Sequence, residues 1–235
     1  PERVRARPVH ARARDLSRGG SLGARMARIS HGGDTTQNSI RQASSTADDP
    51  IALFQTWLEQ AGASGLDEPT AMTVATVDPD GYPDARILLL KGADERGFVF
   101  FTNMESPKAQ SLLRESRAAL CFYWMPLDKQ VRVRGRAEVV SDEEADAYFA
   151  TRPRLSQIGA WASKQSQRME GYFELEAEVA KAALRFGIGK IPRPPFWSGF
   201  RVVPERIEFW TGKPFRRHHR IVYERTREGW RKRWL

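Results

Sequence analysis

The 235-residue chain has very little cysteine and no long hydrophobic run. Cys121 is the only cysteine, which excludes a disulfide-stabilised scaffold and a zinc site built on cysteines. No His-Glu-x-x-His motif offers another zinc site, so we predict no metal. No apolar run approaches the roughly 20 residues that span a bilayer. We therefore predict neither a membrane protein nor a small secreted scaffold.

The motifs that mark common nucleotide enzymes and hydrolases are also missing. Gly187 and Gly189 are followed by Lys190 and an isoleucine, which breaks a dinucleotide-binding pattern. Gly92 and Gly97 have the spacing of a phosphate-binding loop, but Phe98 stands where that loop needs lysine. No Gly-x-Ser-x-Gly segment supplies a nucleophilic serine. Any phosphate group must therefore be held by side chains.

Charge is unevenly distributed along the chain, which carries a net charge of +9. Residues 1–45 hold nine arginines, no lysine and three acidic residues, which leaves little net charge for the rest. We therefore predict no nucleic-acid partner for the folded part. The tail shows no apolar periodicity, and we predict that it is disordered. It is open whether it is a transit peptide, a nucleic-acid-binding arm, or an extension upstream of a start at Met26.

From residue 46 onward the patterns indicate one folded domain, 46–235, with strands and helices interspersed. Asp49 and Pro50 predict the start of a helix that ends at Gly62. Further helices are predicted at residues 106–114, 141–150 and 169–186. Strands are predicted at residues 72–77, 86–91, 98–102, 118–124, 130–140, 200–210 and 220–225. Strands joined mostly by turns, with helices at the periphery, predict an antiparallel α+β barrel that is mainly β.

Several basic residues are candidates for holding a phosphate. Arg86 and Lys91 lie near the two ends of one predicted strand, so a regular strand would point them to opposite faces. Lys108 lies in the first turn of a predicted helix, where free N–H groups also attract anions. Arg152 and Arg154 flank Pro153. Taken singly, each arginine is better explained as a solvated surface cation than as a phosphate ligand.

Two further segments have an unusual composition. Residues 216–220 hold three arginines and two histidines, and an extended run would place Arg216, His218 and Arg220 on one face. Such a cluster indicates either an anion site or an exposed basic hairpin tip. Residues 156–166 are dense in small polar groups around Trp161, with little periodicity. They are typical of a ligand-binding loop, or of a connection that packs its tryptophan in the core.

Taken together, these segments resemble the pyridoxine (pyridoxamine) 5′-phosphate oxidase family over roughly residues 50–235. The most specific stretches are Arg152-Pro-Arg-Leu-Ser-Gln-Ile-Gly-Ala-Trp161 and the pattern Arg216-x-His218-x-Arg220. They occur in order with Arg86-Ile-Leu-Leu-Leu-Lys91, Phe100-Phe-Thr-Asn103, Ser163-Lys-Gln-Ser166, Phe196-Trp-Ser-Gly-Phe200 and Ile207-Glu-Phe-Trp210. The resemblance implies a split β-barrel homodimer with FMN bound at the subunit interface.

The resemblance also implies which residues bind FMN. The matching positions are Arg86, Ile87, Leu88, Leu89, Leu90, Lys91, Phe101, Thr102, Lys108, Gln130, Gln165, Ser166, Trp210 and Arg220. Among them, Arg86, Lys108 and Ser166 would contact the phosphate or ribityl chain. Gln130 would bond the edge of the ring system, and Trp210 would pack near it.

The substrate implied by the resemblance is a phosphate ester, with O2 as the second substrate. Its binding group would be Lys91, Tyr148, Arg152, Ser156, Arg216 and His218. In the family reaction a hydride passes from C4′ of the substrate to N5 of FMN, and O2 then reoxidises FMN and yields H2O2. The product is pyridoxal 5′-phosphate. The catalytic pair would be Arg216 and His218, with His218 either orienting the substrate or handling a proton.

This chain departs from the family pattern in two places. Pro107 stands where the family commonly has an arginine before Lys108, and residues 26–48 lack the tyrosine of an N-terminal lid. The alternatives are another split-barrel flavin oxidoreductase, which would not need the substrate group, or a non-catalytic carrier of FMN or pyridoxal phosphate. We expect a cytoplasmic enzyme of vitamin B6 metabolism.

Overall fold

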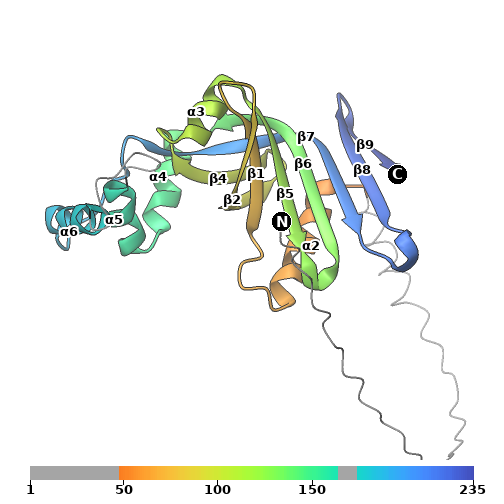
Figure 1. Ribbon diagram of the computed structural model, residues 1–235, viewed down its shortest axis with the longest axis horizontal. Helices are drawn as coiled ribbons and strands as arrows, with labels where there is room; N and C mark the ends of the chain where they lie inside the picture. The colour runs from red at the N-terminus through yellow and green to blue at the C-terminus, as the bar shows by residue number, and fades with distance from the viewer. Residues whose placement is uncertain (1–47, 164–173) are drawn as a thin grey trace, which may run out of the picture.

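In the computed structural model, which describes residues 48–163 and 174–235, one antiparallel sheet of nine strands forms the body of the protein. The strand order is β2-β1-β5-β6-β7-β4-β3, and β8 and β9 continue from β7 (Figure 1). The mainly β, antiparallel prediction is confirmed. The tail predicted to be disordered lies outside the described residues. No described helix is long and apolar enough to cross a membrane.

The strands follow one another mostly through tight turns. They are β1 (Ala71–Val77), β2 (Pro83–Leu89), β3 (Gly92–Asp94), β4 (Gly97–Asn103), β5 (Arg117–Trp124), β6 (Lys129–Val139), β7 (Trp197–Thr211), β8 (His219–Thr226) and β9 (Gly229–Trp234). The β1–β2 turn is the one predicted, with Asp78 Oδ1 accepting from the N–H groups of Asp80 and Tyr82. Strand β2 ends at Leu89, two residues earlier than predicted.

Strand β7 connects the two ends of the molecule. It pairs with β6 along nearly its whole length, with β4 through residues 197–202, and with β8 through residues 206–211. Strands β6 and β7 shift register between Arg134 and Gly135. A Cβ at Gly135 would lie 1.9 Å from the Val203 carbonyl oxygen, so the close approach of the two backbones there requires glycine.

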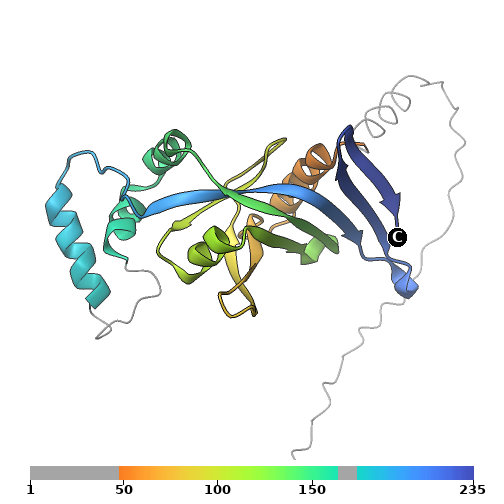
Figure 2. The same cartoon turned by 90° about the horizontal axis from the view of Figure 1, so that it is seen from above.

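The helices occupy the periphery. They are α2 (Pro50–Ala63), α3 (Pro107–Arg114), α4 (Asp142–Thr151), α5 (Arg154–Ala162) and α6 (Glu174–Phe186). Helices α4, α5 and α6 gather at one end of β7, and the β8–β9 hairpin lies at the other (Figures 1 and 2).

Helix α5 corrects the prediction of a loop over residues 156–166. The small residues of this segment hide its helical periodicity. Ile158 and Ala162 lie one turn apart and are both buried, so they give the helix one packed face.

The core lies between α2 and the inner face of the sheet. Asp49 caps α2 by accepting from the Ile51 N–H at 2.8 Å, as its place before Pro50 predicts. Phe54, which is fully buried, meets Phe98 and Phe122 edge to face at ring-centre distances of 4.9 and 5.0 Å. This aromatic cluster holds α2 against the sheet.

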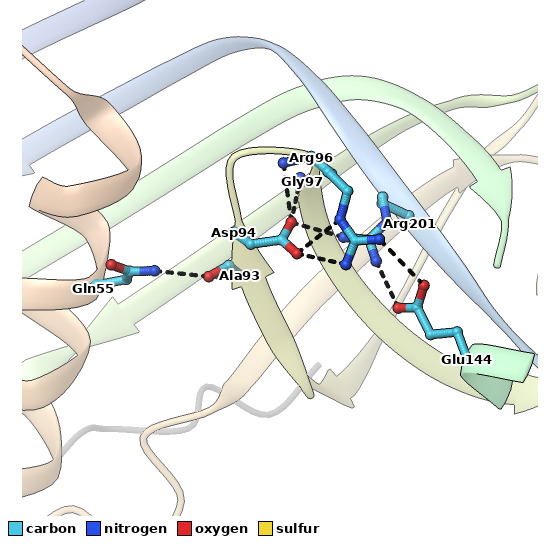
Figure 3. A network of polar contacts seen from close by, with 7 residues as sticks. All are labelled: Gln55, Ala93, Asp94, Arg96, Gly97, Glu144 and Arg201. Carbon is cyan, nitrogen blue, oxygen red and sulfur yellow. Dashed lines mark hydrogen bonds and ion pairs between the residues drawn. The ribbon is translucent and has the colours of Figure 1, made fainter. Parts of the chain in front are cut away.

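A buried arginine joins α4 to the sheet. Arg201 on β7 donates from Nη1 to Asp94 Oδ1 at 2.9 Å and from Nη2 to Glu144 Oε1 at 2.6 Å (Figure 3). Arg96 also donates to Asp94, at 2.8 Å from Nη2. Since Glu144 lies in the first turn of α4, these bonds hold that turn against the sheet.

We expect Phe54→Ala to lower the free energy of unfolding by about 3–5 kcal/mol, because it removes a fully buried ring and leaves a cavity. Urea denaturation followed by tryptophan fluorescence measures this change. Tyr82→Ala, at an exposed turn position, is the control and should change the stability by less than about 0.5 kcal/mol. Equal effects in the two variants would contradict this account of the core.

Candidate functional site

An open pocket of about 340 Å³ lies where α5 meets the sheet. Its lining comes from β2, β4, β7, α5 and the residue that follows α4. The lining residues are Leu88, Phe101, Thr102, Asn103, Arg152, Ser156, Gly159, Ala160, Ser163 and Trp197. Five of them, Leu88, Phe101, Thr102, Arg152 and Ser156, are predicted site residues.

Arg152 is the most unusual side chain of this pocket. Its guanidinium lies 4.9 Å from the ring centre of Trp197 and 5.6 Å from that of Phe149. Its Nη1 is buried and has no hydrogen-bond partner among the described residues. Burial lowers the pKa of Arg152, since the charged form loses its hydration. A buried unpaired donor is costly, and an anionic group bound in the pocket would satisfy it.

Parallel aromatic rings form one wall beside Arg152. Phe101 stacks on Tyr148 at 4.1 Å and on Trp197 at 5.1 Å, with interplanar angles of 9° and 2°. Burial raises the pKa of Tyr148, so its hydroxyl stays a hydrogen-bond donor at neutral pH. This wall supplies flat apolar surface next to a cation, which suits a ring that bears a phosphate.

Two further cations, Lys108 and Arg86, lie near each other, and Arg86 lies two residues before the pocket residue Leu88 on β2. Lys108, in the first turn of α3, is only 8% exposed, and its pKa is lowered by burial and then by the charge of Arg86. Arg86 is held in place by the Val74 carbonyl at 3.0 Å and the Thr76 hydroxyl at 2.9 Å. Arg86 also pairs with Asp84 at 2.5 Å, and two neighbouring cations in a half-buried position attract an anion.

Helix α3, which carries Lys108, starts regularly although Pro107 stands at its beginning. The Ser106 hydroxyl donates to the Asn103 carbonyl at 2.7 Å and makes no cap with the helix. Pro107 takes the first helical position, where the missing N–H costs nothing. The departure from the family pattern at Pro107 is thus compatible with a regular helix start. We call Arg86, Lys108, Tyr148, Arg152 and Ser156 the pocket half of the site.

The other predicted residues meet at the far end of β7, and we call Gln130, Trp210, His218 and Arg220 the hairpin half. Gln130 on β6 and Arg220 on β8 are both register partners of Trp210. The rings of Trp210 and His218 lie 4.9 Å apart. Four predicted residues from separate segments therefore share one surface.

Hydrogen bonds orient two members of the hairpin half. Arg220 donates from Nη2 to Oε1 of the buried Glu208 at 2.8 Å. The Lys213 N–H donates to Nδ1 of His218 at 3.3 Å, so in the neutral ring the proton lies on Nε2. His218 is thereby set as a donor through Nε2.

The two halves lie far apart within one chain. Trp197 belongs to the pocket and Trp210 to the hairpin half, at opposite ends of the fifteen-residue strand β7. At about 3.3 Å per residue the two positions are roughly 40 Å apart along the strand. Figure 2 shows β7 extending along most of the molecule. One small ligand cannot contact both halves of the same protomer.

The remaining predicted residues are less closely tied to either half. Ile87 is exposed and Leu90 buried, as alternation requires, and Leu89 ends β2. Lys91 is exposed in the link between β2 and β3, so the prediction that Arg86 and Lys91 lie near the two ends of one strand is wrong. Gln165, Ser166 and the side chain of Arg216 lie outside the described residues.

The backbone before His218 is not extended, which was the condition for Arg216, His218 and Arg220 to share one face. Residues 214–216 form a tight turn with Phe215 at φ 59°, and β8 begins only at His219. A turn replaces the strand because Pro214 cannot donate to a neighbouring strand. Arg216 therefore does not share one extended face with His218 and Arg220.

Two functional positions were missed by sequence reasoning. Trp197 lies beneath Arg152, and Glu208 orients Arg220. Both lie within stretches that carry the family resemblance. Nothing else in the sequence marked this tryptophan or this glutamate as a residue that supports a site.

Comparison with known proteins identifies the family. Residues 58–186 match the family model described as pyridoxamine 5′-phosphate oxidase, and residues 197–235 match the one described as the pyridoxine 5′-phosphate oxidase C-terminal dimerisation region. The chain belongs to the pyridoxamine 5′-phosphate oxidase family.

Relatives agree with this assignment. The pyridoxine/pyridoxamine 5′-phosphate oxidase of Azorhizobium caulinodans is 58% identical over 190 residues, which cover 80% of this chain and 90% of that protein. The Caulobacter vibrioides protein of the same name is 56% identical, over 78% of this chain and 82% of the relative. The crystal structure of PhzG from Burkholderia lata, in complex with tetrahydrophenazine-1-carboxylic acid, matches with a TM-score of 0.76 at 31% identity, over 80% of this chain and 92% of that one.

FMN affinity should fall at alkaline pH, because Lys108 attracts a phosphate only while it is protonated. Its pKa is lowered from the usual 10.5, so the charge is lost at a lower pH than in an ordinary lysine. Fluorescence titration of the apoprotein with FMN between about pH 7 and 9.5 measures the fall. In Lys108→Arg the guanidinium keeps its charge, and affinity should stay nearly constant. If FMN affinity falls with pH in the same way in both proteins, Lys108 is not part of the phosphate site.

Proposed function

We propose that this protein oxidises pyridoxamine 5′-phosphate and pyridoxine 5′-phosphate to pyridoxal 5′-phosphate, using FMN and O2. Family membership and the relatives that carry this name support the activity. The observation in the structure that favours a phosphate-ester substrate is the buried, unpartnered Nη1 of Arg152 beside a wall of stacked rings. A second anion site at Lys108 and Arg86 fits the phosphate of FMN.

We also propose that two copies of the chain together complete each site. The pocket half and the hairpin half lie at opposite ends of β7, so the hairpin half of one protomer would complete the pocket half of its partner. The match of residues 197–235 to a dimerisation region supports this arrangement, because that segment contains β7 and the hairpin. A homodimer of this kind has two equivalent sites.

The side chains divide the work of binding. Arg152, Tyr148 and Ser156 would bind the substrate phosphate, with one permanent charge and two hydroxyl donors. The rings of Phe101 and Trp197 exclude water from one side of the pocket. Lys108 and Arg86 would hold the FMN phosphate, with Arg220 and Gln130 from the partner as further polar contacts. FMN, when bound, supplies the redox chemistry and passes the electrons to O2.

His218 would act as a hydrogen-bond donor and not as a base. Its Nδ1 already accepts from the Lys213 N–H, so Nε2 carries the proton in the neutral ring. The donor at Nε2 would orient the substrate on FMN. Arg216, on the same hairpin, would position the substrate ring, and its charge would favour the negative charge that FMN gains with the hydride.

Anaerobic addition of pyridoxamine 5′-phosphate to the FMN-loaded protein should bleach the visible absorbance of FMN. Admission of air should restore the absorbance and release H2O2. A flavin spectrum unchanged by this substrate would refute the proposed activity. Bleaching by a reduced phenazine carboxylic acid alone would favour an activity on the compound class bound by the PhzG relative.

Arg152→Ala should raise the KM for pyridoxamine 5′-phosphate at least about tenfold and leave kcat nearly unchanged. The reason is that the phosphate is bound equally in the ground and transition states. Steady-state release of H2O2 measures both constants. Arg154→Ala is the matched control. Arg154 lies on the other side of Pro153, and its guanidinium donates to the carbonyls of Gly187 and Gly189 instead of facing the phosphate. A kcat defect without a KM change would contradict the proposed role of Arg152.

A further inference from the structure

Arg193 makes three hydrogen bonds beside the pocket. Its Nε donates to Asp146 Oδ1 at 2.5 Å, its Nη2 to Asp142 Oδ1 at 2.6 Å, and its Nη1 to the Trp197 carbonyl at 2.7 Å. The side chain is only 13% exposed. Pro192 and Pro194 restrict the backbone on both sides of it. A guanidinium with a stiff backbone and three bonds in different directions has little freedom left.

The partners of Arg193 are the elements that carry Arg152. Asp142 and Asp146 lie one turn apart on α4, whose final turn holds Tyr148 and whose C-cap is Arg152. Trp197 begins β7, and its ring lies under the guanidinium of Arg152. Arg193 therefore bonds both to the helix from which Arg152 projects and to the residue on which Arg152 rests.

Arg152 needs such support, because within the described residues no side-chain hydrogen bond orients it. Its Nη1 is unpartnered, and its contacts are the rings of Phe149 and Trp197. Both rings are positioned by elements that Arg193 joins. A small rotation of α4 against β7 would move the guanidinium off the ring below it and turn Nη1 away from the pocket.

We propose that Arg193 is a positioning residue for the substrate-phosphate subsite. It holds α4 and Trp197 together so that Arg152 presents its free donor to the phosphate. This inference rests on the proposed function, which assigns that phosphate to Arg152. It predicts a defect that is specific to phosphate binding and separate from a general loss of stability.

Arg201 provides a matched comparison, because it also bridges two carboxylates and is as buried as Arg193. Its bonds go to Asp94 and to Glu144 in the first turn of α4, away from Arg152 (Figure 3). Breaking either bridge removes a partly buried ion pair that holds α4. Only the bridge of Arg193 includes Trp197.

The experiment compares Arg193→Gln with Arg201→Gln in the FMN-loaded protein. For Arg193→Gln we expect the KM for pyridoxamine 5′-phosphate and the inhibition constant of inorganic phosphate to rise together, by about five- to tenfold. We expect kcat and FMN content to stay within about twofold. For Arg201→Gln we expect Tm to fall, with both phosphate constants within about twofold of the parent protein.

Equal changes in the phosphate constants of the two variants would overturn the proposal, since they would reflect a general loosening of α4. Unchanged constants in a folded Arg193→Gln would overturn it as well.

If Arg193→Gln does not fold, the double variant Asp142→Asn, Asp146→Asn releases the helix while Arg193 keeps its carbonyl partner, and the same rise is expected. If the parent protein does not oxidise the substrate, the proposed function fails. Calorimetric titration of inorganic phosphate then still tests the role of Arg193, with unchanged affinity in Arg193→Gln overturning it.

Discussion

The backbone pairing of β7 is the constraint on which the rest of the structure depends. This strand bonds to β6 along nearly its whole length, to β4 over its first residues and to β8 over its last. It therefore fixes the pocket half and the hairpin half at a set separation. The close approach of the paired strands β6 and β7 at Gly135 depends on a residue without a side chain, since any Cβ there would meet the Val203 carbonyl.

Pairing of charges separates structural arginines from functional ones. Arg193 and Arg201 are largely buried, and each is bonded to two carboxylates, which is how a fold tolerates a buried cation. Arg152 has no such partner among the described residues, and its Nη1 is buried. The protein thus leaves a buried donor unsatisfied where a ligand phosphate can satisfy it. Such positions reduce the stability of the empty protein and are typical of binding sites.

Much of the fold was predictable from local patterns. The Asp49–Pro50 helix start, the Asp78–Gly81 turn and the alternation along β6 are short-range signals, and the structure has each of them. Helix α5 was missed because Gly159 and Ala160 weaken an apolar pattern that only burial against α6 and Trp197 reveals. The strands β3 and β9 were missed because a short edge strand rich in polar residues carries no pattern of its own.

The sequence by itself determined most of the element types, the family and the identity of the candidate site residues, because these depend on residue type and order. Only the tertiary structure decided how those residues divide into two halves, since that separation depends on the length and pairing of β7. It also decided that Arg152 has a buried donor without a partner among the described residues and that Nδ1 of His218 accepts from the Lys213 N–H. Burial and hydrogen bonding arise between segments far apart in the chain, so no local pattern encodes them.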